Sequence, residues 1–440
     1  MATVFICRPP RRPAPQLPSG QLVLDAPPLI PKPGGRGMGQ MLMMLPMVGG
    51  SAAMALTFGG SSQGPTRWLM MGVMGASALG MLGMGFSGGG RKEMGFARRD
   101  YLRQLAQHRV RVNRVAQQQR ETLWYLHPDP DELWSVAASY RLWERRRDDA
   151  DFCVARIGLG PQALATTLIP PATKSLEALE PLSALALRRF ITAYTALADM
   201  PAAMAVNGFS RVYVRGDDEQ AAGLVRAMLA QLVTFHAPDD LLIAACVAPE
   251  RAAHWDWLKW LPHALHPEEQ DALGGIRLVA TSVLGLEAML QELISDRPRF
   301  DAAGQGTFAG PQLVIVLDGG DPVGSDHLLA GAGIEGVTII DLTGTPPRAL
   351  DRATVVIDVA DRLTSTTMSG ATRLGRSDQM TIVEAEMLAR QLTPLRLSGD
   401  AGPGTPLAAT LGIAELLDLG DPYRFEPERT WVVGPNRARL

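Results

Sequence analysis

The chain has 440 residues and a mass of 47.3 kDa, which allows about two to four folding units at roughly 100–200 residues per domain. Its hydrophobic content of 46% excludes disorder caused by a lack of apolar residues. Three scattered cysteines, Cys7, Cys153 and Cys246, exclude a disulfide framework and fit a reducing compartment. The net charge of −3 conceals a split, because residues 1–120 carry +12 and the remainder −15. This asymmetry predicts two different environments for the two parts of the chain.

The first 36 residues are rich in Pro, Gly and Arg. They contain only two short apolar runs, at 4–6 and 22–24, so this segment has too little apolar surface to fold alone. Two interpretations stay open for this predicted cytoplasmic tail, 1–36. It is a disordered leader, or it is an extended segment that lies along a partner, for example by strand addition.

Residues 37–90 are almost uncharged, and eleven of the 20 Met residues fall between Met38 and Met84. Arg67 interrupts two apolar blocks, each of which supplies the ~20 residues that a membrane span needs. We therefore expect a transmembrane helical hairpin with helices at about 38–58 and 68–87. A signal peptide would have to start near residue 1. A buried hairpin in a soluble protein is the other alternative.

Basic residues flank the predicted hairpin on both sides. The positive-inside rule then predicts a protein of the inner (plasma) membrane with both termini in the cytoplasm. Nine basic and two acidic residues fall within 91–120, and the absence of Pro predicts a basic helical stalk over 91–126. The stalk could contact membrane lipid headgroups, other subunits or nucleic acid. Because aromatic residues are few here and the later part is acidic, no nucleic acid is expected.

From residue 127 onward, short apolar strands alternate with helices. The expected strands include 154–157, 241–247, 313–317, 337–340 and 354–357, and the expected helices include 179–197, 221–235 and 286–294. A hairpin is expected around Asn207-Gly208. Alternation of this kind predicts one α/β domain over 127–440 with a largely parallel sheet.

Three of these strands end in aspartate, at Asp318, Asp341 and Asp358. Ligands of such sheets gather at the carboxyl ends of the strands. The run 313–318 has the apolar-then-Asp shape of a Walker B strand, whose Asp holds Mg²⁺ in nucleotide motors. The matching phosphate loop would follow the strand that ends near Gly216. Gly216 and Asp318 are therefore the candidate nucleotide-binding residues, unless the aspartates only cap loops.

The residues that cleave ATP are missing from this pattern. The chain has four lysines, and none lies in a G-x-x-x-x-G-K-[ST] sequence. The acidic run 217–219 would repel phosphate, and Gly319 follows Asp318 where a motor carries a carboxylate. We expect no catalytic residue and no cofactor in this segment. The predicted fold class is two transmembrane helices plus a helical stalk, then a Rossmann-like, degenerate P-loop ATPase-like domain.

Three histidines fall close together, at His254, His263 and His266. They could suggest a zinc site, but no cysteine is near and three tryptophans share the stretch. A packed aromatic surface without a metal is the expected structure.

The order of parts resembles that of a known family. A Pro-rich leader, two apolar spans, a basic stalk and an α/β domain resemble the amino-terminal part of EccC, the FtsK/SpoIIIE-type motor of mycobacterial type VII (ESX) secretion systems. The stretch 254–263, HWDWLKWLPH, and the opening 5–12, FICRPPRR, look like family signatures. The resemblance covers essentially all 440 residues and looks closest to the ESX-5 branch.

This resemblance implies properties that composition and spacing do not. Family proteins continue into three tandem cytoplasmic ATPase domains, which use ATP and Mg²⁺. The family implies a homo-hexamer around a membrane pore with EccB, EccD and EccE as partners. It also implies export of Esx and PE/PPE proteins.

Three functions follow as hypotheses. The first is a membrane anchor, stalk and coupling domain that links the ATPase domains of a type VII secretion motor to its pore. The second is a membrane-anchored DNA translocase of the FtsK type. The third is a scaffold subunit that is not coupled to ATP.

Overall fold

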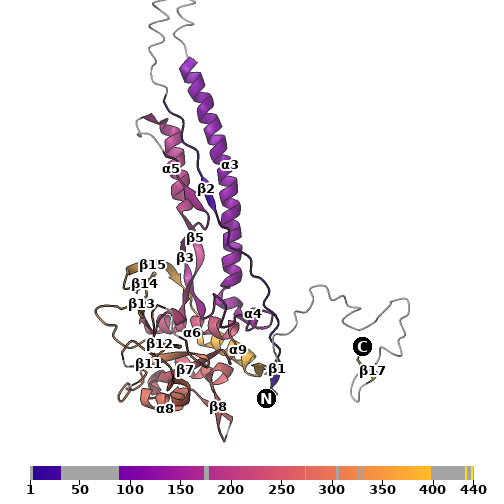
Figure 1. Cartoon of the computed structure of the whole chain (residues 1–440), viewed down its shortest axis with the longest axis vertical. Coiled ribbons are helices and arrows are strands. Elements are labelled where there is room, and N and C mark those ends of the chain that lie inside the picture. Colours follow the sequence, from indigo (N-terminus) through magenta and orange to yellow (C-terminus); the bar gives the residue numbers. More distant parts are fainter. Residues whose placement is uncertain are drawn as a thin grey trace, which may run out of the picture. The chain divides into compact units, whose positions relative to one another are not determined.

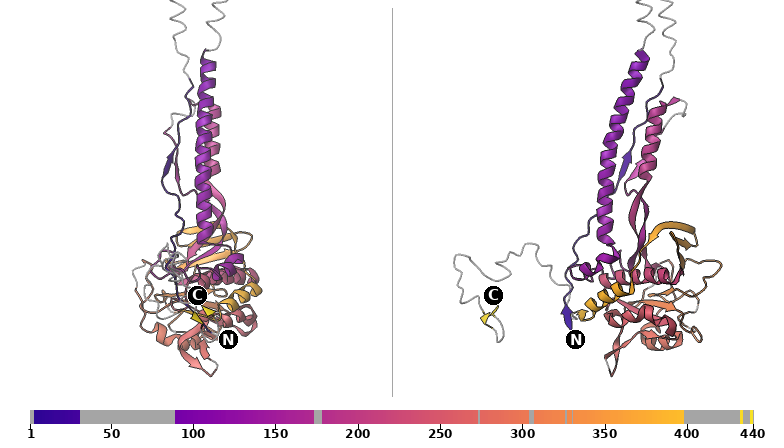
Figure 2. Two further views of the ribbon diagram at one scale, coloured as in Figure 1. Left: turned by 90° about the vertical axis from the view of Figure 1, so that its right-hand side faces the viewer. Right: turned by 180° about the vertical axis from the view of Figure 1, so that it is seen from behind.

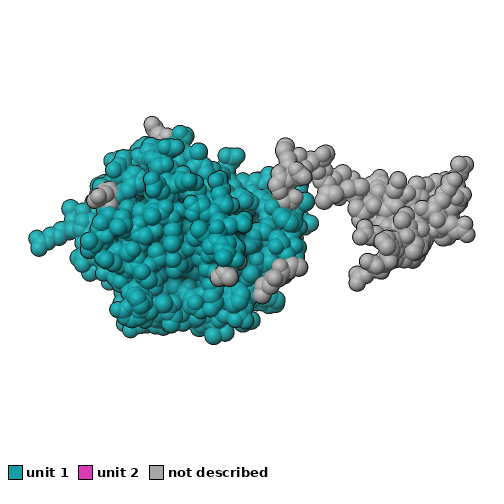
Figure 3. Space-filling model, turned by 90° about the horizontal axis from the view of Figure 1, so that it is seen from below, with its two compact units in different colours: residues 1–16, 120–162, 198–440 teal, residues 17–119, 163–197 magenta. Residues whose placement is uncertain are grey.

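The computed structural model describes most of the chain and divides it into two compact units. The described residues are 3–30, 89–172, 178–272, 274–303, 307–325, 327–329 and 331–397, with short strands at 432–433 and 438–439. Unit 1 comprises residues 1–16, 120–162 and 198–440, and unit 2 comprises 17–119 and 163–197. Figure 3 shows the described part of unit 1 as one continuous body.

The membrane part of the predicted fold class is corrected. Within the described residues, we find no helix that combines the length and the apolarity needed to cross a bilayer. The longest described helix, α3 (Gly89–Leu126), is long enough but carries a basic side chain on almost every turn. The predicted spans at 38–58 and 68–87 lie outside the described residues. The predicted inner-membrane localisation rested on those spans and is withdrawn with them.

Unit 2 is built from two helices and a short strand pair. The first 31 residues of α3 and the whole of α5 (Pro181–Thr195) lie side by side (Figures 1 and 2). The Tyr194 hydroxyl donates to Asn113 Oδ1 at 2.8 Å, and Arg98 pairs with Glu180 at 2.8 Å. Strand β2 (Gln21–Val23) pairs in parallel with β4 (Thr167–Ile169). Part of the tail is therefore extended chain paired with this unit.

Unit 1 is organised around a sheet of ten described strands in the order β10-β7-β11-β12-β6-β13-β14-β15-β3-β5. The strands from β10 to β13 run parallel, whereas β14 and β15 continue the sheet antiparallel. The sheet is mixed, which corrects the expectation of a largely parallel one. The bounds are β10 Val279–Ala280, β7 Leu241–Val247, β11 Gln312–Asp318, β12 Val337–Asp341, β6 Arg211–Gly216, β13 Thr354–Val359, β14 Leu363–Thr367, β15 Gly370–Ser377, β3 Val154–Ala163 and β5 Ala196–Ala205.

Helices cover both faces of the parallel part. Strand β7 is buried on both sides, and its alternate residues enter two different apolar cores. Leu241 and Ile243 contact the core that contains α6 (Asp218–Phe235), α4 (Leu133–Ala137) and α9 (Ile382–Leu392). Leu242 and Ala244 contact the core under α8 (Val283–Ile294). Because successive side chains of a strand point to opposite faces, the sheet has an apolar core and helices on each side, and unit 1 is a three-layer α/β body.

Smaller elements complete unit 1. Strand β1 (Val4–Ile6) pairs in parallel with β16 (Leu395–Leu397), so the first residues add a strand to their own unit. A hairpin joins β8 (Leu265–Asp271) to β9 (Gly274–Arg277). Short helical turns lie at Pro130–Glu132, Val206–Gly208, Pro249–Arg251, Ala252–Trp255 (α7), Asp256–Trp260 and Pro262–Ala264. Strands β17 (Val432–Val433) and β18 (Ala438–Arg439) pair with each other.

Candidate functional site

The turn at Gly216 joins β6 to α6 with a single intervening residue. Gly216 has φ +149°, and a Cβ on it would lie 2.2 Å from the Val359 carbonyl oxygen, so only glycine fits. Asp217 caps α6 through its Oδ1, which accepts from the amides of Glu219 and Gln220. This turn is too short to wrap around a phosphate, and two amides of the first helical turn already have an internal acceptor.

Asp318 ends β11 in a fully buried position. Its Oδ1 lies 2.5 Å from Arg251 Nε, and its Oδ2 accepts a hydrogen bond from Trp255 Nε1 at 2.8 Å. Arg251 also reaches Asp218 Oδ2, at 3.0 Å, in the first turn of α6. The hydrogen bond to Asp318, and after it the one to Asp218, raise the pKa of Arg251 above its ordinary value.

Arg251 thus connects the two places where the sequence predicted nucleotide ligands. Strand β12 lies between β11 and β6 in the sheet, and the side chain of Arg251 links the ends of β11 and α6. In a Walker B strand the carboxylate at the position of Asp318 would hold Mg²⁺. Here the guanidinium of Arg251 is paired with that carboxylate instead. We call this set, Gly216, Asp218, Arg251, Trp255 and Asp318, the closed edge.

The neighbouring acidic side chains are paired as well. Glu219 forms an ion pair with the fully buried Arg226 and lies 3.3 Å from His254 Nδ1. Asp341 Oδ1 accepts from the amides of Thr343 and Gly344 at 3.1 and 2.6 Å, which is the loop-capping role left open for it.

The three histidines of the predicted cluster do not share a site, because each one contacts a different partner. His263 Nε2 lies 2.8 Å from the His236 carbonyl oxygen, and His266 Nδ1 accepts from the Glu269 amide. Burial lowers the pKa of His263 to about 4. Among the described residues, we find no group of three or more His, Cys, Asp or Glu side chains that could hold a metal ion.

A second concentration of charge lies where α3 ends within unit 1. The last carbonyls of a helix have no partner inside the helix. Here three consecutive carbonyls each accept from an arginine. The contacts are Arg141 Nη1 to Tyr125 at 2.8 Å, Arg145 Nη2 to Leu126 at 2.7 Å and Arg156 Nη1 to His127 at 3.3 Å. The positive charges also stabilise the helix, because they lie at the negative end of its dipole. We call these three side chains the arginine joint.

One buried and two half-buried carboxylates balance the arginine joint. Arg156 is fully buried and pairs with Asp378 at 2.8 Å and with Asp129 at 2.9 Å. Arg145, also fully buried, lies 3.2 Å from Asp151 Oδ2. Burial raises the pKa of Asp378 to about 6. The guanidinium groups of Arg145 and Arg156 are therefore desolvated, which distinguishes the joint from a set of surface ion pairs.

Sequence reasoning missed Arg251 and the arginine joint. The stretch 254–263 drew attention to Trp255 as part of a signature, but its bond to Asp318 joins residues 63 positions apart. The run 145–147, three arginines in an acidic region, was the available signal for the joint. Neither pattern indicates which carboxylates or carbonyls the arginines contact.

Comparison with known proteins identifies relatives of this chain by sequence. No protein-family model matches the chain. The ESX secretion system protein EccC of Thermomonospora curvata is 43% identical over 456 residues, covering 100% of this chain and 34% of that protein. The chain belongs to the EccC family of ESX secretion proteins. This establishes the resemblance noted in the sequence at the level of the family.

Other EccC proteins match less closely. EccC4 of the Mycobacterium tuberculosis ESX-4 system is 32% identical over 76% of this chain and 24% of its own length. EccC5 of the ESX-5 system of the same organism is 29% identical over 96% of this chain and 32% of its own length. The chain therefore spans about a third or less of the length of these EccC relatives.

Two solved structures have a slight likeness to this chain. T. curvata EccC (ATPases 2 and 3) in complex with a signal sequence peptide covers 50% of this chain and 53% of its own, at 14% identity and a TM-score of 0.28. EssC (ATPases 2 and 3) from Geobacillus thermodenitrificans covers 57% of this chain and 50% of its own, at 11% identity and a TM-score of 0.34. Likenesses of this size carry no argument about the site.

Proposed function

We propose that this chain is a coupling domain of an EccC-type secretion ATPase that does not itself hydrolyse ATP. The observation that carries the proposal is the arginine joint. Helix α3 is continuous from residue 89 to 126, and its last carbonyls are held by arginines of unit 1, two of which are fully buried. A helix end fixed in this way transmits a displacement of its last turn to the α/β body.

The closed edge supports the absence of hydrolysis. Arg251 neutralises Asp318, and the acidic start of α6 is directed at Arg251 and Arg226. A bound nucleotide would have to displace Arg251 and place its phosphates beside Asp218 and Glu219. That Gly216 and Asp318 bind a residual nucleotide is a prediction from the sequence alone. Our proposal is that ATP and Mg²⁺ act in other domains of the family's proteins.

Several finer points are part of the same proposal. We carry over from the family a secretion complex that includes EccB, EccD and EccE, a sixfold assembly, and Esx and PE/PPE proteins as cargo. The division into a stalk at 91–126 and an α/β domain at 127–440 is proposed on the same basis. We propose no ESX branch, since EccC4 and EccC5 resemble this chain about equally. The family favours neither the DNA translocase nor the uncoupled scaffold.

The proposal is tested by loosening the joint in a working motor. This chain would replace the matching region of T. curvata EccC, with Arg141→Ala as the variant. Arg390→Ala is the matched control, because Arg390 also stacks on an aromatic ring, Trp260, but contacts no residue of α3. Export of an ESX substrate and the ATPase rate would be measured together.

We expect Arg141→Ala to lower export several-fold while the ATPase rate changes little, and Arg390→Ala to change neither. Hydrogen exchange at 120–126 would show whether the end of α3 has been loosened. Unchanged export despite faster exchange there would refute the coupling role.

A further inference from the structure

The opening residues bind to unit 1 as a short strap. We use this name for residues 4–12, which include the predicted family signature at 5–12. Val4, Phe5 and Ile6 pair in parallel with Leu395–Leu397, and the Val4 amide donates to the Pro394 carbonyl at 2.7 Å. Ile6 packs against the main core of unit 1. Strand addition, one of two interpretations left open for the tail, therefore occurs within the chain.

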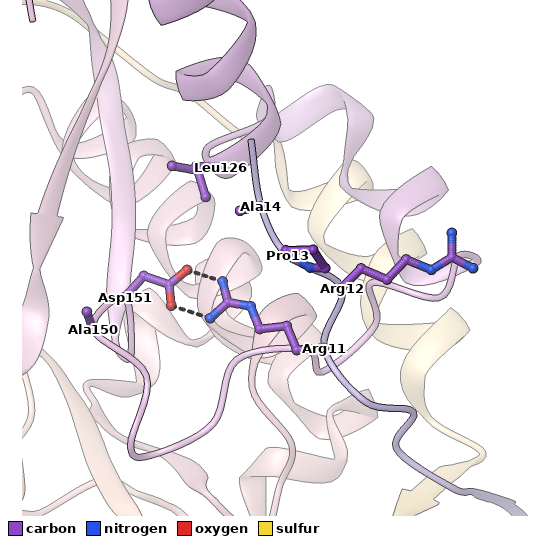
Figure 4. Close-up of a pocket in the computed structure, with 7 residues that line it drawn as sticks. All are labelled: Arg11, Arg12, Pro13, Ala14, Leu126, Ala150 and Asp151. Atoms are coloured by element: carbon purple, nitrogen blue, oxygen red, sulfur yellow. Dashed lines mark hydrogen bonds and ion pairs between the residues drawn. The ribbon is translucent and has the colours of Figure 1, made fainter. Parts of the chain in front are cut away.

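Arg11 makes the most specific contact of the strap. Its Nη1 and Nη2 lie 2.7 and 2.5 Å from the two carboxylate oxygens of Asp151, and Nη1 also lies 2.9 Å from Asp149 Oδ2. Figure 4 shows this two-pronged pair at the wall of a pocket of about 450 Å³, which Leu126, the last residue of α3, also lines. Burial would raise the pKa of Asp151, but Arg11 and Arg145 together hold it below its ordinary value.

Two further arginines of the strap have partners of their own. Arg8 pairs with Asp240, and both side chains are less than one-fifth exposed. The Arg12 guanidinium lies 4.0 Å from the centre of the Tyr140 ring. Figure 4 shows Arg12 directed away from Asp151. We call the contacted set, β16 with Tyr140, Asp149, Asp151 and Asp240, the strap receptor.

The receptor recognises a definite kind of peptide. It offers strand hydrogen bonds to an apolar triplet and then three sites for arginine side chains. Pro9 and Pro10 favour an extended chain between Arg8 and Arg11. The contact is nevertheless small. The strand ladder is three residues long, and the side chains of Val4 and Phe5 are 48% and 70% exposed. A contact of this size can open and exchange without unfolding unit 1.

We propose that the strap receptor is a peptide-binding site, and that a second copy of this chain supplies its own residues 4–12 to it by exchange of straps. A second copy carries the complementary sequence by definition, including the arginines that match Asp151 and Asp240. This inference is independent of the coupling role proposed above.

Peptide binding tests the receptor directly. The probe is a labelled peptide of residues 3–15 with Cys7→Ser, and the control is the same composition in scrambled order. Both are titrated by fluorescence anisotropy into the full chain and into full-length Arg8→Ala/Arg11→Ala, whose own strap is weakened. We expect at least tenfold tighter binding to the double variant, because the wild-type strap competes at an effective concentration on the order of millimolar. Equal affinity for both chains, equal binding of the scrambled peptide, or no binding would overturn the receptor.

A charge exchange tests the second copy. Full-length Arg8→Asp and full-length Asp240→Arg each place like charges together within one chain. When the two are mixed, each strap meets an opposite charge on the other copy. Sedimentation velocity should then show a mixed dimer that neither variant forms alone and that weakens several-fold from about 50 to 300 mM salt. A mixture that sediments like the separate variants, while both retain the wild-type circular dichroism spectrum, would overturn exchange between copies.

Discussion

The end of helix α3 and the end of strand β11 are both held by arginine, but water reaches them differently. In the arginine joint, the side chains of Arg145 and Arg156 are 0% exposed. At the closed edge, the side chain of Arg251 is 21% exposed, although its partner Asp318 is fully buried. A buried arginine cannot leave without stranding a carboxylate in the interior. The guanidinium of Arg251 can swing towards solvent, but Asp318 then stays buried with only the hydrogen bond from Trp255, so opening the closed edge also costs unfolding free energy.

The largest effect is expected at Arg156. Arg156→Ala leaves Asp378, whose side chain is 7% exposed, without its main counter-ion. Removing one partner of such a buried pair costs about 3–5 kcal/mol of unfolding free energy. Urea unfolding would measure it beside Arg390→Ala, whose exposed pair with Glu386 should contribute less than about 1 kcal/mol. Similar losses of unfolding free energy in the two variants would show that the ion pairs of the arginine joint contribute no more to stability than an exposed ion pair.

Acid should destabilise unit 1 through its buried histidines. Burial lowers the pKa of His127 to about 4, of His236 to about 3 and of His263 to about 4. Between about pH 4 and 6.5 the unfolded chain binds these protons and the native chain does not, so the free energy of unfolding falls as the pH falls. Each histidine should contribute roughly 2 kcal/mol between pH 7 and pH 5. His263→Gln should make the measured slope shallower, and an unchanged slope would contradict this assignment.

Gly216 and Gly274 both have a positive φ, but only at Gly216 would a Cβ also clash with a neighbouring atom. Gly216→Ala would bring a Cβ to 2.2 Å from the Val359 oxygen. Gly274, in the turn between β8 and β9, also has a positive φ, of +127°, but a Cβ there meets nothing within 4 Å. We expect Gly216→Ala to cost about 1–3 kcal/mol more than Gly274→Ala in chemical denaturation. Equal costs would mean that the β6–α6 turn can relax.

A smaller effect on stability than at Arg156 is expected at Arg251. Arg251→Gln keeps an amide donor near Asp318 and should cost about 1–2 kcal/mol, less than Arg156→Ala. Adding Asp318→Asn should return part of that loss, because the buried charge then disappears as well. A double-mutant cycle by urea unfolding measures this coupling, and additive losses would mean that Arg251 and Asp318 do not interact in solution.

The features that the sequence predicted well are local ones. The apolar run of β11 and its terminal Asp318 were expected at 313–318, and α6 was expected at 221–235 and occupies 218–235. Asn207-Gly208 predicted a hairpin, but it forms a short helical turn between β5 and β6, which are not neighbours in the sheet. Turn chemistry alone therefore did not determine which strands pair.

The features that were missed depend on contacts between distant residues. The antiparallel extension by β14 and β15 carries no local signal that distinguishes it from a separate sheet. Arg251 meets Asp318, 67 positions later, and Arg156 meets Asp378, 222 positions later. An arginine pattern gives charge but not the identity of its partner. The closed edge could be suspected from Gly216 and Asp318, but the side chain that closes it could not.

The most direct test is calorimetry of the full chain with ATP and Mg²⁺, beside Arg251→Gln and Asp318→Ala. If Arg251 closes the edge and unit 1 takes no nucleotide, the wild-type chain should give no binding heat. Binding of one nucleotide per wild-type chain that Asp318→Ala abolishes would contradict the closed edge and would make unit 1 a nucleotide sensor.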